Sequence, residues 1–198
     1  MADDKKYIID FFQFLSKAEK LKNTLRTSHT SNGRHESTAE HSWMLSLLGL
    51  LITEKYPNTD HAKILSLCIV HDIAASITGD IPAPQNNDQS KKEGNEFIAM
   101  IELVDCLPDR LACHILSLWD EYNRGLTTEA KLVKALDKIE TIFQHTIGIN
   151  PEGFDYLYNL EYGEDFTSFD EITNDIRKYL NNKTQEIINL YNTKLKKQ

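Results

Sequence analysis

The residues with the clearest chemical potential are a histidine and an aspartate side by side, His71 and Asp72. They follow an apolar run over 64–70 in which hydrophobic residues fall on every face of a helix, so both side chains are expected in or beside the interior. A buried, ionised aspartate costs several kcal/mol unless it is paired or binds a cation. The pair alone leaves two interpretations open: a metal-binding position, or a hydrogen-bonded histidine beside a capping aspartate.

Two further residues on other predicted helices offer similar side chains. His41 shares a helical stripe with Leu45, Leu48 and Ile52, and Asp137 lies at the border of another apolar face. Two imidazoles and two carboxylates form a mixed nitrogen and oxygen ligand set. This set suits Mn, Co, Fe, Ni or Zn, with positions left for water and substrate. Spacing alone leaves a metal site and ordinary core residues equally open.

Composition limits what the protein can do. Of 198 residues, 40% are hydrophobic and 26% charged, and the formal net charge is −8. Such a chain repels a phosphate backbone, which argues against nucleic-acid binding but leaves room for a small phosphorylated ligand beside an arginine and a metal. No apolar run approaches the ~18 residues of a membrane span. Three cysteines without a Cys-x-x-Cys pair fit a reducing compartment, so we expect a cytoplasmic protein that binds no membrane.

Helical periodicity dominates the chain. The polar segment 22–37 is predicted as a loop, Thr38 as the N-cap of the helix after it, and Asp60 as the start of a helix that runs to about Thr78. No alternating pattern is long enough to build a sheet. We therefore expect an all-α bundle of about six to eight helices. The helical stretches are predicted at 5–21, 38–55, 60–78, 89–104, 108–122, 127–147 and 168–195, with a short helix after Pro151.

Three segments carry a resemblance to a known family. They read Ser37-Thr-Ala-Glu-His-Ser42, His71-Asp-Ile-Ala-Ala-Ser-Ile-Thr-Gly-Asp-Ile-Pro82 and Glu129-Ala-Lys-Leu-Val-Lys-Ala-Leu-Asp137. In this order they resemble the HD-domain metal-dependent phosphohydrolases, and most closely the 5′-deoxynucleotidases among them. The resemblance runs from about Leu25 to His145. It implies a single HD domain over 1–198, with a helical extension over about 150–198.

The resemblance also implies roles for individual residues. His41, His71, Asp72 and Asp137 would bind one divalent metal ion, with Mn, Co, Fe, Ni, Zn and Mg all open as its identity. Arg26 would hold the substrate phosphate, a task that suits a guanidinium because it pairs with two phosphate oxygens. Asp80 would lie near the sugar and the attacking water, and Asp72 would help to orient that water. For Arg26 and Asp80 the alternatives are a solvated loop charge and a turn residue.

The sequence departs from the family pattern at two positions. The family usually reads His-Asp-x-x-Glu, and its glutamate takes part in proton transfer, whereas this chain has Ala75 there. On a continuous helix, positions 71 and 75 share a face, so Ala75 would remove a catalytic group worth roughly 10²–10⁴-fold in rate. An engineered replacement and a natural, less active member are both open. Thr27 stands where the family often has an aromatic residue, which weakens any transfer of substrate preference.

The polar segment around Arg26 contains further candidates. His29, Arg34, His35 and Glu36 are either a solvated loop or the mouth of the site, with Arg34 as a second phosphate contact. The apolar stripe of the last helix is a packing face or a dimer face. The residues of this stripe are Ile172, Ile176, Tyr179, Leu180, Ile187 and Leu190.

The function implied by the resemblance is hydrolysis of nucleoside 5′-monophosphates, with deoxyribose preferred, by a homodimer. Three alternatives stay open. The first is an HD-type nucleoside triphosphate phosphohydrolase, since a fold does not fix a substrate. The second is a module that binds metal and nucleotide without turnover. The third is a purely structural metal site.

Overall fold

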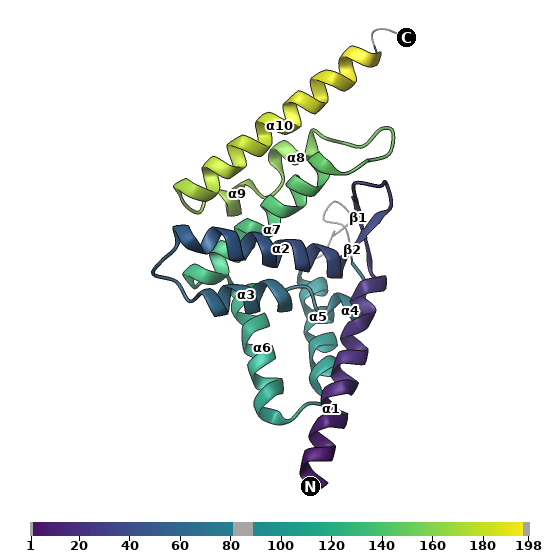
Figure 1. Cartoon of the computed structure of the whole chain (residues 1–198), viewed down its shortest axis with the longest axis vertical. Coiled ribbons are helices and arrows are strands. Elements are labelled where there is room, and N and C mark those ends of the chain that lie inside the picture. Colours follow the sequence, from purple (N-terminus) through teal and green to yellow (C-terminus); the bar gives the residue numbers. More distant parts are fainter. Residues whose placement is uncertain (1, 81–88, 196–198) are drawn as a thin grey trace.

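The structure of the chain is a computed structural model that describes residues 2–80 and 89–195 (Figure 1). Ile81 and Pro82 of the second motif lie outside the described residues. The all-α prediction is confirmed, because seven helices of ten residues or more account for most of this part of the chain. The elements are α1 (Ala2–Ala18), η1 (Glu19–Asn23), β1 (Leu25–His29), β2 (His35–Ser37), α2 (Thr38–Ile52), η2 (Thr53–Lys55), α3 (His61–Val70), α4 (Ala75–Thr78), α5 (Gln89–Val104), α6 (Asp109–Arg124), α7 (Thr128–Ile147), α8 (Tyr158–Glu161), α9 (Glu164–Thr167) and α10 (Glu171–Leu195).

Helix α7 is the central element of the bundle. It packs against α2, α3, α6, α9 and α10 and against strand β1. Its side chains Leu132, Val133, Leu136 and Ile142 are fully buried, as a helix surrounded by other helices requires. Figure 1 shows α10 with α8 and α9 on one side of α2 and α7, and α1, α5 and α6 on the other. Asp137 therefore lies at mid-length of the most buried helix.

Two N-caps fix where the helices that carry the histidines begin. Ser37, not Thr38, caps α2: its Oγ accepts a bond from the backbone N–H of Glu40, and the Glu40 carboxylate accepts one from the N–H of Ser37. This reciprocal pair is a capping box, and it shifts the predicted cap by one residue. Asp60 caps α3 as predicted, by accepting from the N–H of Lys63.

The predicted helix over 60–78 is interrupted at the pair His71 and Asp72. Helix α3 ends at Val70, and α4 begins at Ala75. Between them the chain forms i→i+3 bonds, from the N–H of Ile73 to the carbonyl of Val70 and from the N–H of Ala75 to the carbonyl of Asp72. Such bonding tightens the chain to three residues per turn. His71 and Asp72 therefore lie at the end of a helix rather than inside one.

The polar segment 22–37 contains a small antiparallel hairpin rather than a loop alone. Strands β1 and β2 pair Leu25 with Ser37 and His29 with His35, with an irregularity between the two pairs. The hairpin is held against the end of α7, where Gln144 donates to the carbonyl of His29 and the N–H of Ile149 donates to that of Thr30. A Cβ on Gly148 would lie 2.1 Å from the His29 carbonyl oxygen, so only glycine permits this approach.

The segment after α7 is tied down by one buried arginine. Arg177 of α10 is 3% exposed, and its guanidinium donates to the carbonyls of Asn159, Leu160 and Tyr162. The short helix predicted after Pro151 begins at Tyr158, and α9 follows it. This segment is thus fixed beside α7 by bonds to α10.

One window of the described chain, His61–Thr78, is long and apolar enough to cross a membrane by composition. It spans α3, the tight turn and α4, and α3 alone has ten residues against the ~20 that a spanning helix needs. Ile64, Leu67 and Cys68 are fully buried in the core. Packing within the bundle accounts for the apolar character of this window.

Candidate metal and phosphate site

His41, His71 and Asp137 converge on one buried point. They come from the first turn of α2, the end of α3 and the middle of α7, and they are 0%, 4% and 6% exposed. The Nε2 of His41 lies 3.2 Å from a carboxylate oxygen of Asp137. The Nε2 of His71 lies 3.2 Å from Asp72, whose carboxylate also lies 4.0 Å from the His41 ring. All four residues predicted as metal ligands are thus brought together.

The second nitrogen of each histidine ring fixes which way the first one faces. The Nδ1 of His71 donates to the carbonyl of Cys68 over 2.9 Å, and the Nδ1 of His41 bonds to the Glu140 carboxylate. Since these partners accept hydrogen bonds, the Nδ1 atoms carry the protons and the Nε2 lone pairs face the cluster. Both Nε2 atoms are buried without a hydrogen-bond partner. Two orphaned lone pairs beside carboxylates fit a divalent metal ion.

The electrostatics of this cluster also favour a cation. Burial and the nearby Arg26 lower the pKa of His41, but the carboxylates of Glu140 and Asp137 outweigh them and raise it to about 9. Without a metal ion the Nε2 of His41 therefore binds a proton at neutral pH, and a metal ion would replace that proton. The hydroxyl of Tyr122 donates to Asp137 over 3.0 Å, and the ammonium of Lys138 donates to the same oxygen over 2.9 Å. These two donors hold the Asp137 carboxylate in place, and the carboxylates of Asp137 and Glu140 supply the negative charge that favours a cation beside His41.

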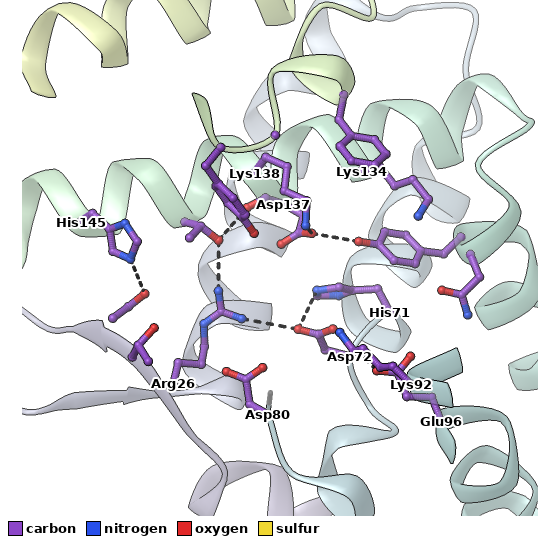
Figure 2. A pocket seen from close by; sticks show the side chains of 18 of the residues that line it. Arg26, His71, Asp72, Asp80, Lys92, Glu96, Lys134, Asp137, Lys138 and His145 are labelled. Atoms are coloured by element: carbon purple, nitrogen blue, oxygen red, sulfur yellow. Dashed lines mark hydrogen bonds and ion pairs between the residues drawn. The ribbon is translucent and has the colours of Figure 1, made fainter. Parts of the chain in front are cut away.

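Arg26 of β1 lies beside the cluster and lines a cavity together with His71, Asp72 and Asp137. Figure 2 shows its guanidinium directed at Asp72, from which it is 3.6 Å away, and its Nη2 donates to Thr141 over 3.0 Å. Burial lowers its pKa, but the carboxylates of Asp72, Asp80 and Asp137 raise it above the usual range. Arg26 is therefore a fixed positive charge next to the candidate metal position.

Glu36 of β2 supports Arg26 from behind. Its side chain is 3% exposed, and its carboxylate lies 3.4 Å from the Nε of Arg26. Burial and Glu140 raise the pKa of Glu36 to about 7, while Arg26 opposes this shift. The solvated-loop interpretation is wrong for Glu36, because its side chain is buried beside Arg26.

Asp80 lies near Arg26 and Asp72 and lines the cavity (Figure 2). Burial and the charge of Asp72 raise its pKa, whereas Arg26 opposes the rise. Asp80 thus lies beside Arg26 and Asp72, and the role near the sugar and the attacking water that the resemblance implies for it stays a prediction.

Three predicted site residues do not line the cavity: the fully buried His41, Ala75 and Arg34. Ala75 follows the tight turn and shares a three-residue repeat with Asp72 rather than a helical face with His71. The guanidinium of Arg34 binds the Glu40 carboxylate through both of its terminal nitrogens. Arg34 is therefore paired with the first turn of α2, and this arrangement does not support a second phosphate contact.

The cavity has a volume of about 640 Å³ and extends well beyond the metal ligands. Its lining includes residues that the sequence reasoning missed. Most of them lie outside the motifs, on α5, α6 and the α8–α9 segment, whereas Lys134 lies within the third motif and Lys138 directly after it, both on α7. Thr27, the position where the family often has an aromatic residue, and His145 also line it. His145 bonds to Ser28 and Asn159, so it joins the hairpin to the segment after α7. The lining residues that the sequence reasoning missed include Lys92, Glu96, Tyr122, Lys134, Lys138, Tyr158, Tyr162 and Phe166.

The fold and the site together define a helical metal-binding domain. The family model described as "HD domain" matches residues 18–176. The chain therefore belongs to the HD-domain family, which confirms the resemblance seen in the motifs.

Proteins of known sequence and structure agree with this assignment. The chain is 34% identical to the 5′-deoxynucleotidase HDDC2 of Xenopus laevis over 134 residues, 67% of this chain and 66% of that protein. It is 35% identical to the 5′-deoxynucleotidase hdd1 of Schizosaccharomyces pombe over 137 residues, 66% of this chain and 68% of that one. A solved structure, a predicted metal-dependent phosphohydrolase from Magnetospirillum magnetotacticum, aligns with a TM-score of 0.66 at 26% identity and covers 73% of each chain.

Proposed function

We propose that the protein hydrolyses the 5′-phosphate of (deoxy)ribonucleoside 5′-monophosphates with one bound divalent metal ion. The observation that carries this proposal is the convergence of two orphaned histidine nitrogens, two carboxylates and Arg26 around one buried point at the cavity. The similarity to 5′-deoxynucleotidases from several eukaryotes supports the choice of substrate class.

Each residue of the site has a task in this proposal. His41, His71, Asp72 and Asp137 hold the ion, which when bound neutralises phosphate charge and eases deprotonation of water. Arg26 pairs with the phosphate oxygens, and Glu36 and Thr141 keep its guanidinium in place. Asp80, whose pKa is raised by burial, is placed to orient water or the sugar.

Ala75 is the weak point of this machinery. Its methyl group cannot transfer a proton, so turnover should be slow in the chain as it stands. A glutamate at 75 would follow Asp72 by three residues on the tight turn and so extend from the side of the chain that carries Asp72. We therefore expect Ala75→Glu to raise the rate about 100-fold or more.

The test measures phosphate release from ribo- and deoxynucleoside monophosphates with added Mn²⁺ or Co²⁺. It compares Ala75→Glu with the unsubstituted chain, which has Ala75 and is called the wild type below as the reference for all variants. Arg26→Ala in the faster background should lower kcat/KM about 100-fold, because the phosphate loses its fixed charge partner. Arg34→Ala is the matched control, since that guanidinium binds Glu40 instead. If neither the unsubstituted chain nor Ala75→Glu releases phosphate although the metal is bound, the monophosphatase proposal is wrong. Triphosphates and a non-catalytic binding role then come next.

We further propose a cytoplasmic homodimer with nucleotides as its ligands. Support for self-association comes from apolar side chains that stay exposed at the end of α10, with Leu190 at 64% and Tyr191 at 43%. Light scattering on the purified chain would give the oligomeric state, and a monomer at micromolar concentration would contradict the homodimer.

A further inference from the structure

The cavity has an aromatic wall opposite the hairpin. Tyr158, Tyr162 and Phe166, all from the α8–α9 segment, line the same cavity as Arg26 and the metal ligands. The rings of Tyr158 and Tyr162 lie 5.3 Å apart with an interplanar angle of 32°. Phe166 is 43% exposed and Tyr158 37% exposed, so both rings offer free surface. These three residues are called the aromatic wall below.

The aromatic wall is held close to the metal ligands. The ammonium of Lys138 lies 2.9 Å from Asp137 and 5.3 Å from the centre of the Tyr162 ring. One ammonium group therefore bridges the wall and a metal-binding carboxylate. The turn at Gly163 has φ +68°, and a Cβ there would lie 2.5 Å from Lys138, so the segment packs tightly onto α7. Arg177 fixes the same turn from the other side.

Lys134 is a second cation at this end of the cavity. Its ammonium lies 4.5 Å from the centre of the Tyr122 ring and 5.6 Å from that of Phe166. Within the described residues, no hydrogen bond or ion pair joins it to another group. An ammonium that lines a cavity between two rings keeps three donors available for a ligand.

We propose that the aromatic wall and Lys134 form the subsite for the nucleobase, so that the protein selects nucleotides over base-free sugar phosphates. The inference rests on the proposed function for the position of the phosphate. Aromatic rings accept any base by stacking, whereas Lys134 donates to an acceptor atom on the base edge. Lysine cannot accept a hydrogen bond, so this end of the cavity favours base edges rich in carbonyl oxygens.

The test compares affinities for thymidine 5′-monophosphate and 2-deoxyribose 5-phosphate in Mn²⁺, by titration calorimetry and by KM for phosphate release. The wild type should bind the nucleotide at least about 10-fold more tightly. Phe166→Ala should weaken nucleotide binding about 10-fold and leave the sugar phosphate unchanged, because only the base stacks. Phe143→Ala is the matched control, since Phe143 has a similar exposure of 38% on α7 and does not line the cavity.

Lys134→Met gives an independent readout, with the exposed Lys131→Met on the same helix as control. It should weaken nucleotide binding and leave the sugar phosphate unchanged. Equal losses for both ligands would place Lys134 at the phosphate and overturn the inference. So would equal affinities of the wild type for the two ligands, or unchanged nucleotide binding in Phe166→Ala. Base-dependent binding without phosphate release would instead contradict the proposed function alone.

Discussion

At the scale of single residues, the site depends on buried groups that hold other groups in place. Glu140 and the Cys68 carbonyl orient the two imidazoles, and Glu36 and Thr141 orient Arg26. Each of these partners is buried or part of the backbone, so the groups at the proposed metal and phosphate positions are held in place without a ligand. Such preorganisation is what electrostatic catalysis requires.

Glu36 gives this account a pH dependence. The pKa of Glu36 is about 7 in the folded chain against an ordinary 4.5, mainly through burial. The unfolded chain therefore holds fewer protons between these values, and stability falls as pH rises through the window. Glu36→Gln does not titrate. Its free energy of unfolding relative to the wild type should rise by roughly 2 kcal/mol from about pH 5 to about pH 8.

Urea unfolding at both pH values measures this difference. Glu40→Gln serves as the control, because the hydrogen bond from Arg34 lowers the pKa of Glu40 to about 2 and its carboxyl does not titrate in the window. Parallel curves for the wild type and Glu36→Gln would mean that Glu36 is ionised in the folded chain.

Periodicity predicted that the four candidate metal ligands lie on or beside apolar helical stripes, and the resemblance to the family motifs, not the spacing, proposed them as ligands. His41 with Leu45 and Ile52, and Asp137 within α7, obey that periodicity. Glu36, Lys138 and the aromatic wall could not be predicted in this way. Their partners are distant in the sequence, and polar or aromatic side chains on short elements carry no periodic signal.

At the scale of elements, the start of α2 decides where His41 lies. The capping box of Ser37 and Glu40 satisfies two N–H groups directly before the histidine. Ser37→Ala should lower the free energy of unfolding by about 1 kcal/mol. Thermal or urea unfolding measures the loss. Ser46→Ala on the same helix, whose hydroxyl donates only to the carbonyl of Ser42, should cost less. A larger loss in Ser46→Ala would refute the capping argument.

The elements that the sequence did not predict are the hairpin and the tight turn at 71–74. The strands have five and three residues, and their pairing is irregular, so no alternating pattern marks them. Contacts with the end of α7 stabilise them instead. The tight turn sits inside an apolar stretch that reads as continuous helix. In both cases tertiary packing overrides local preference.

At the scale of the whole molecule, one hydrogen bond ties the turn after α2 to the start of α10. The hydroxyl of Tyr56 donates to Asp170 over 2.6 Å. Burial raises the pKa of Asp170, but bonds from Thr173 and Tyr56 outweigh it and lower the pKa. A carboxyl whose pKa is lowered on folding stabilises the folded chain at pH values above its ordinary pKa of about 4. This stabilisation is lost as the pH falls below that value.

Tyr56→Phe should therefore cost about 1–2 kcal/mol at neutral pH, and the cost should shrink as the pH falls below about 4. Unfolding curves at several pH values provide the measurement. Tyr179→Phe, an exposed tyrosine on α10, is the matched control. If both variants lose the same amount, the bond between Tyr56 and Asp170 does not join the two parts of the bundle.

The helical class followed from the helical periodicity of the apolar residues, and the family followed from three motifs that occur in the order typical of the family. The position of the α8–α9 segment along the cavity could not be predicted from the sequence. That arrangement depends on Arg177, Gly163 and Lys138, which meet only in the folded chain.

The central claim is that a divalent metal held by His41, His71, Asp72 and Asp137 is required for phosphate release. The most direct measurement follows phosphate release from thymidine 5′-monophosphate by Ala75→Glu before EDTA treatment, after it, and after Mn²⁺ is restored. We expect activity to vanish with the chelator and to return with the metal, and Asp137→Asn in the same background to stay inactive throughout. Release that persists in EDTA, or that survives Asp137→Asn, would contradict the account.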